Sequence, residues 1–101
     1  GTCVRDFIHV ADLADAHLLA LDALVIGQPG HEVFNVGTGR GASVREIIDL
    51  LVEVTGIDRS PVIVDRRPGD PAAVVADPSR IRDRLGWEAS LTVRDMVESA
   101  W

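Results

Sequence analysis

Residues 4–13 read VRDFIHVADL, and this stretch determines how the start of the chain is organised. The apolar residues from Phe7 onward favour an extended strand, and the residues that follow favour a helix. Arg5 and Asp6 are a cation and an anion that a strand core would not accept unpaired. An arginine at a strand edge presents a fixed fork of donors to a phosphate or carboxylate, so Asp6 is expected to orient that fork or to be its counter-ion. The alternative is an ordinary surface ion pair.

Composition limits the classes of protein that this chain can represent. It has 101 residues, 47% hydrophobic but only 4% aromatic, so we expect one domain with an aliphatic core. The net charge is −6 and the charges are interspersed, which argues against nucleic-acid binding. The pattern contains no membrane span and no signal peptide. The lone Cys3 has no partner for an internal disulfide, which favours a cytoplasmic location.

Periodicity and turn residues predict a small mixed α/β fold, with roughly three to four short strands and about four helices. The first helix is expected to begin with Asp12 as its N-cap and to run to about Ile26, before a loop at Pro29–Gly30. After the opening stretch, strands are expected at Glu32–Val36, Pro61–Asp65 and Ala72–Ala76.

Capping residues mark the other helices. Ser43 and Glu46 form a capping-box pattern for a helix that ends at Gly56. A third helix is expected from an Asp77–Pro78 cap to Leu85.

The last part of the chain has two further signals. Trp87 follows a helix-ending glycine and is expected to fold back on Ile81. Thr92 and Asp95 predict the start of a fourth helix, whose apolar face includes Trp101.

A glycine-rich loop offers one candidate cofactor site. Residues 37–42, GTGRGA, fit the pattern G-x-G-x-x-G/A after an expected strand and before a helix, with Asp65 placed where a ribose-binding acid could lie. A dinucleotide fold needs further strand-helix-strand units, which the downstream residues do not offer. Glycines that allow positive φ and close packing explain the loop, so we assign it no cofactor-binding residue.

A charged loop at residues 65–71, DRRPGDP, is the second candidate site. The adjacent Arg66 and Arg67 repel each other unless an anion lies against them, and Asp70 alone cannot neutralise both. The loop is therefore either an anion-binding site or a solvated cluster of charges. The three histidines, His9, His17 and His31, have no metal-ligand or acid/base spacing, so we expect structural roles for them.

Three motifs resemble one family. VRDFIHVADLADAH in residues 4–17 closely resembles the stretch that leads into the substrate-binding part of UDP-glucose 4-epimerases, which are extended short-chain dehydrogenase/reductases acting on nucleotide sugars. The pattern R-R-x-G-D at residues 66–70 resembles their nucleotide-binding loop, although Pro68 stands where many relatives have Glu. The pattern D-x-S-x-x-x-x-x-L-G-W matches residues 77–87.

This resemblance implies that residues 1–101 are the C-terminal, substrate-binding portion of an NAD-dependent isomerase of galactose metabolism. By the resemblance, Arg5 and Arg67 hold the nucleotide phosphates and Asp70 contacts the nucleotide. An N-terminal Rossmann domain, absent from this chain, would bind NAD and carry the catalytic Tyr-x-x-x-Lys pair. The chain has no Tyr, so we expect no catalytic, cofactor-binding or metal-binding residue in it and no activity by itself.

The partners that follow are a UDP-sugar and, for the parent enzyme, a second copy in a homodimer. The chain alone is expected to self-associate, because its first helix is apolar on most sides. Two alternatives stay open: part of another nucleotide-sugar epimerase or dehydratase, or a stand-alone nucleotide-binding module.

Overall fold

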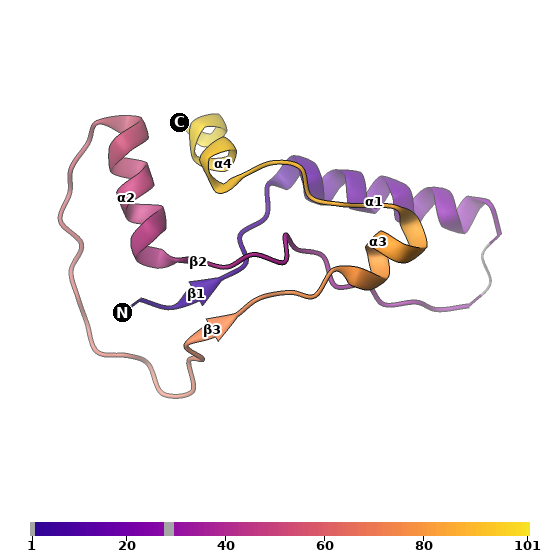
Figure 1. Cartoon of the computed structure of the whole chain (residues 1–101), viewed down its shortest axis with the longest axis horizontal. Helices are drawn as coiled ribbons and strands as arrows, with labels where there is room; N and C mark the ends of the chain where they lie inside the picture. The colour runs from indigo at the N-terminus through magenta and orange to yellow at the C-terminus, as the bar shows by residue number, and fades with distance from the viewer. Residues whose placement is uncertain (1, 28–29) are drawn as a thin grey trace.

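The structure is a computed structural model that describes residues 2–27 and 30–101. It confirms the predicted small mixed α/β fold, with three strands and four helices among the described residues (Figure 1). The elements are β1 (Val4–Arg5), α1 (Val10–Val25), β2 (Ala42–Ser43), α2 (Val44–Thr55), β3 (Ala73–Val74), α3 (Ser79–Leu85) and α4 (Val93–Ala100).

The sheet is small, and β1 is its central strand. It pairs with β2 in antiparallel register, Val4 opposite Ser43, and with β3 in parallel register, Val4 opposite Ala73. The order β2-β1-β3 brings two segments that are distant in sequence, β2 and β3, to the start of the chain. Arg5 therefore lies in the middle of the sheet.

Helix α1 begins three residues earlier than predicted, because its N-cap is His9 and not Asp12. The Nδ1 atom of His9 accepts from the backbone N–H of Ala11 at 3.0 Å, and Nε2 lies 3.0 Å from the Ser99 hydroxyl. His17 bonds the Leu13 carbonyl one turn earlier. These contacts agree with the structural roles predicted for both histidines.

Helices α2 and α4 lie side by side (Figure 1), and the sequence located both of their starts. Each begins with the predicted capping box, Ser43 with Glu46 and Thr92 with Asp95. These exposed carboxylates accept hydrogen bonds from the capped segment, which lowers the pKa of both acids. The two helices are also joined by Arg94, whose Nη2 lies 2.6 Å from Glu53 Oε1.

The core forms where α1 and α3 pack together (Figure 1). Trp87 folds back on Ile81, as predicted, and both pack with Ala16 of α1 in one buried cluster. The indole Nε1 of Trp87 donates to the Asp12 carbonyl at 2.9 Å, which satisfies its one polar atom.

The cap of α3 was only partly predicted. Its N-cap residue is Pro78, but the Asp77 carboxylate accepts from the Ser79 N–H at 3.0 Å, as a capping aspartate would. The hydrogen bonds from Ser79 lower the pKa of Asp77. Gly86 ends the helix at φ +68°, a conformation that favours glycine.

Two predicted strands are not formed. Glu32–Val36 and Pro61–Asp65 carry strand-forming residues, yet neither belongs to the sheet. A strand exists only by pairing its backbone with another strand, and no described segment lies in register with either. Ala73–Val74 is the part of the predicted strand at residues 72–76 that does pair, because β1 lies beside it.

The molecule is a thin slab of 52 × 32 × 15 Å. Among the described residues only four apolar side chains are buried, whereas many on α1 are exposed. Trp101, predicted on the apolar face of the last helix, is the C-cap of α4 and is 72% exposed. No described helix has both the length and the apolar character needed to cross a bilayer. Of the loop predicted at Pro29–Gly30, Pro29 lies outside the described residues.

Candidate functional site

Arg5 lies on the central strand, and its guanidinium is held from two directions. The Nη1 atom donates to the Val4 carbonyl at 2.8 Å. The Nη2 atom donates to Asp70 Oδ1 at 2.9 Å, and the two side chains are 29% and 23% exposed. This ion pair links residues 65 positions apart in the sequence, so it depends on β1 and β3 lying side by side.

Arg67 reaches the same carboxylate from the loop before β3. Residues 68–69 form a turn, with Gly69 at φ +81° and the Asp70 N–H donating to the Arg67 carbonyl at 3.2 Å. This turn brings Arg67 Nη2 to 3.3 Å from Asp70 Oδ2. The Arg67 side chain is 85% exposed, so most of its donors face solvent.

The structure thus brings together the three residues that the sequence singled out. Asp70 offers one oxygen to each arginine, so Arg5, Asp70 and Arg67 form a cluster with one negative and two positive charges. A guanidinium has five N–H donors, and the contacts described use only some of those on each arginine. The cluster can therefore accept a further anion without releasing Asp70.

Asp6 neither pairs with Arg5 nor orients its guanidinium, which corrects both roles that the sequence suggested. Its Oδ1 accepts from the Thr38 N–H at 2.9 Å and from the Thr38 hydroxyl at 2.7 Å. Its Oδ2 accepts from the N–H groups of Gly39 at 3.0 Å and Ala76 at 3.2 Å. Burial alone would raise the pKa of Asp6, but these hydrogen bonds lower it below its usual value. Asp6 ties the glycine loop and the residues after β3 to β1.

The glycine loop does not fit a dinucleotide pyrophosphate. Gly37 is buried, and a Cβ there would lie 2.6 Å from Ala76 Cβ and 2.7 Å from Asp6 Oδ2. A Cβ on Gly41 would collide with Val4. The amides of Thr38 and Gly39, which a phosphate would require, already bond Asp6. Close packing explains Gly37 and Gly41, as predicted from the sequence.

The amides at the start of α2 are occupied as well. The N–H of Val44 donates to the Cys3 carbonyl at 3.0 Å, that of Arg45 to Thr2 Oγ1 at 2.9 Å and that of Glu46 to Ser43 Oγ at 3.1 Å. A phosphate at a helix N-terminus needs such amides free. The amides of Val44, Arg45 and Glu46 are therefore not free to bind a phosphate of NAD.

Arg66 differs from its neighbour Arg67. Its Nη1 lies 3.6 Å from Cys3 Sγ, so it does not only face solvent. Cys3 is partly buried and its thiol is free.

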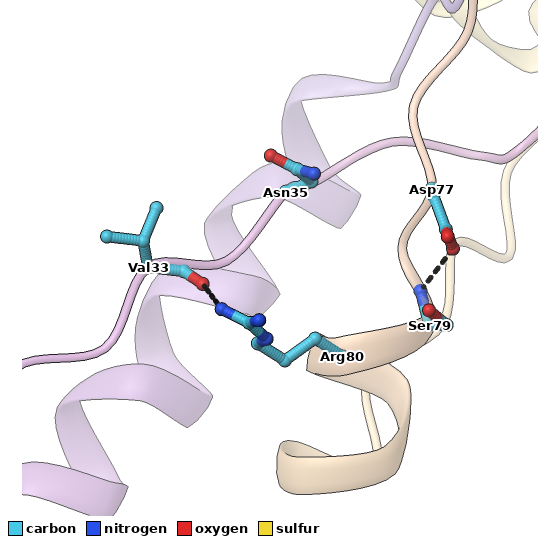
Figure 2. Close-up of a pocket in the computed structure, with 5 residues that line it drawn as sticks. All are labelled: Val33, Asn35, Asp77, Ser79 and Arg80. Carbon is cyan, nitrogen blue, oxygen red and sulfur yellow. Dashed lines mark hydrogen bonds between the residues drawn. The ribbon is translucent and has the colours of Figure 1, made fainter.

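A separate hollow of about 310 Å³ lies at the start of α3 (Figure 2). Its walls bond one another: Arg80 Nη1 donates to the Val33 carbonyl at 3.2 Å, and Asp77 accepts from Ser79. Asn35 also lines it. The hollow shares no residue with the arginine cluster, and its one cation is already engaged by a carbonyl. We therefore take the cluster as the candidate site.

Sequence comparison places the chain among known proteins. Residues 1–100 match the family described as GDP-mannose 4,6 dehydratase. A UDP-glucose 4-epimerase of Azospirillum brasilense is 56% identical over 87 residues, which cover 86% of this chain and 25% of that protein. The chain belongs to the extended short-chain dehydrogenase/reductases that act on nucleotide sugars. A UDP-arabinose 4-epimerase 1 of Arabidopsis thaliana is 44% identical over 102 residues, which cover 100% of this chain and 24% of that protein.

The fold is that of the same family. The crystal structure of the UDP-glucose 4-epimerase from Bifidobacterium longum, in complex with NAD+ and UDP, superimposes with a TM-score of 0.88 at 45% identity. The match covers 98% of this chain and 29% of that one. The chain therefore spans 24–29% of the length of these three relatives.

The hydrogen bonds of two aspartates, Asp6 and Asp12, were not predicted from the sequence. Asp6 was seen as a partner of Arg5, and Asp12 as a helix cap. Asp12 is 3% exposed and accepts from the N–H groups of Ser90 and Leu91, at 3.2 and 2.9 Å. The sequence signal for this contact was an acid, Asp12, within an apolar stretch. Such an acid needs a hydrogen-bond partner if it is buried, but the sequence does not identify that partner.

Proposed function

We propose that residues 1–101 are the C-terminal, UDP-sugar-binding portion of a UDP-glucose 4-epimerase. The parent enzyme would interconvert UDP-galactose and UDP-glucose in galactose metabolism, as a cytoplasmic homodimer. The names of the relatives support this assignment, as does the UDP bound in the Bifidobacterium longum enzyme.

The observation that carries the proposal is the convergence of two arginines on one carboxylate. Arg5 comes from the central strand and Arg67 from the loop before β3, and both contact Asp70. With Asp70 holding both guanidinium groups, Arg5 and Arg67 can bind the two phosphates of one UDP. Each arginine would do so through charge-assisted hydrogen bonds. Asp70 is then a positioning residue for both arginines, and by the family resemblance it also contacts the nucleotide.

This portion of the enzyme would contribute binding rather than chemistry. Anchoring at the diphosphate supplies binding energy at a distance from the sugar, so the sugar can turn while UDP stays in place. NAD, which would remove and return a hydride at C4 of the sugar, is assigned to the N-terminal domain of the parent. That assignment agrees with the occupied glycine loop and with the absence of tyrosine from this sequence.

A different sugar is the second candidate. A UDP-arabinose 4-epimerase is 44% identical over the whole of this chain, so the same diphosphate site would bind UDP-arabinose. Steady-state assays of the parent with UDP-galactose and UDP-arabinose would separate the two by kcat/KM.

UDP titration by calorimetry in the parent protein tests the site. Arg67→Ala removes charged hydrogen bonds worth about 1.5–3 kcal/mol each, so we expect a loss of affinity of roughly one to two powers of ten. Arg5→Ala should act alike. Arg67→Lys should recover only part of the loss, because lysine keeps the charge but not the planar two-point contact.

The matched control is Arg59→Ala, which removes the same charge from an exposed position in the same connection. It should change UDP affinity little, and Arg66→Ala should also have a smaller effect than Arg67→Ala. Equal, small losses in all these variants would contradict the proposed site and leave the cluster as solvated charges.

A further inference from the structure

The most exposed apolar run among the described residues lies directly before the arginine cluster. Val62, Ile63 and Val64 are 87%, 88% and 77% exposed. They belong to the connection between α2 and β3, which follows the outer edge of the molecule (Figure 1). Within the described residues, no hydrogen bond joins the backbone of residues 62–64 to another segment.

The sequence of this run is that of a buried strand. Three consecutive β-branched residues stand between Pro61 and Asp65. Neighbouring residues of a strand point to opposite faces of the sheet. A strand with one solvent-exposed face therefore alternates apolar and polar residues. An unbroken apolar run is typical of a strand that is covered on both faces and paired. Left bare, such a run is an aggregation hazard.

The comparison with a solved relative indicates which part of the protein would cover residues 62–64. The same fold, this connection included, superimposes on 98% of the chain within a protein of which it forms 29%. The backbone therefore takes this course inside a molecule more than three times as long. The exposed run is a surface that the remaining part of such a molecule can pair with.

We propose that Pro61–Asp65 is a docking strand, and that its occupant is a β-strand of the parent protein from outside residues 1–101. The inference rests on the proposed function in one respect, the existence of that longer parent. Backbone pairing would supply the missing hydrogen bonds, and the rest of the parent would cover the two apolar faces.

Docking would also position the diphosphate site. The run leads through Asp65 and Arg66 into Arg67, whose side chain is 85% exposed and held by one ion pair at 3.3 Å. A paired strand has a fixed register, so it would fix where the loop at residues 66–70 begins. The docked strand and Asp70 would then together fix the position of Arg67.

Amide hydrogen exchange without any nucleotide tests the proposal. We expect the amides of residues 62–64 to exchange at nearly unprotected rates in the 101-residue chain and at least roughly a hundredfold more slowly in the parent, because only a paired amide needs an opening step. The amides in the middle of α2 are the internal control, since they are paired in both proteins. Equal, fast exchange of residues 62–64 in both proteins would overturn the proposal.

A second copy of the chain is the competing occupant. If strands pair between copies, protection of residues 62–64 will appear in the 101-residue chain itself and rise with concentration, which would also overturn the proposal. UDP is absent from the measurement, so failure of the phosphate-binding proposal leaves this test intact.

A substitution gives an independent readout. Ile63→Asp should leave the melting temperature of the 101-residue chain unchanged, because the side chain is solvated there. In the parent it should lower the melting temperature or prevent folding, while Ile63→Val should behave as wild type. An unchanged melting temperature of the Ile63→Asp parent would contradict the docked strand.

Discussion

Asp6 accepts four hydrogen bonds from residues on two loops, and the Asp6→Asn variant tests its role. The asparagine side chain has one acceptor oxygen where Asp6 has two. Its NH2 group would face the donors that had bonded the second carboxylate oxygen. Two of these donors are the backbone N–H groups of Gly39 and Ala76. We expect the free energy of unfolding to fall by about 1–3 kcal/mol, measured by urea denaturation at pH 7. An unchanged midpoint would show that the loops hold together without Asp6.

The same residue predicts a pH dependence. Hydrogen bonds outweigh burial and lower the pKa of Asp6 in the folded chain. A lowered pKa means that the contribution of Asp6 to stability is fully present above its unfolded pKa, about 3.9, and is lost as the pH falls through the folded value. Wild type should therefore lose its stability advantage over Asp6→Asn on acidification below about pH 4. Parallel stability profiles for the two proteins in that range would contradict this assignment.

Among the secondary-structure elements, α1 and the connection before α4 are joined by one buried carboxylate. Asp12 accepts from the Ser90 hydroxyl at 3.2 Å and from two backbone N–H groups, those of Ser90 and Leu91. Asp12→Ala should lower the free energy of unfolding by about 1–3 kcal/mol, because these buried donors lose their acceptor. Asp15→Ala is the control on the same helix, since Asp15 is exposed, and it should have little effect. Equal melting temperatures for the two variants would contradict the buried tie.

The whole molecule is thin, and it exposes many large apolar side chains. Its radius of gyration is 16.6 Å, against about 13 Å expected for a compact chain of this length. Leu18, Leu21 and Leu24 of α1 are each more than half exposed. The isolated chain should therefore associate or be marginally stable, which sedimentation velocity at several concentrations and a thermal melt would show. A sharply monomeric and highly stable chain would contradict this prediction.

The isolated chain should also have no epimerase activity. It contains no tyrosine for the proposed proton-transfer pair, and the Thr38 and Gly39 amides of the glycine loop already donate to Asp6. A coupled assay of UDP-galactose conversion with added NAD is the measurement, with the parent protein as the positive control. Turnover by the chain alone, free of contaminating enzyme, would overturn the assignment of chemistry to the rest of the parent.

The sequence by itself determined those features whose partners lie within a few residues. The capping boxes at Ser43 and Thr92 and the helix end at Gly56 were all predicted, because each rests on hydrogen bonds or φ values inside one turn. The motifs at residues 4–17 and 66–70 likewise identified the family and the candidate arginines. These patterns need no knowledge of what the chain packs against.

Only the tertiary structure decided which charges meet and which strands form. The sequence predicted Asp6 as the partner of Arg5, but Asp70 is the partner because β3 lies beside β1. Residues 73–74 became a strand for the same reason, whereas residues 32–36 and 61–65 did not, because no described segment pairs with them. A long-range contact depends on the position of both partners, and a strand depends on its neighbour, so neither can be determined from one local stretch of sequence.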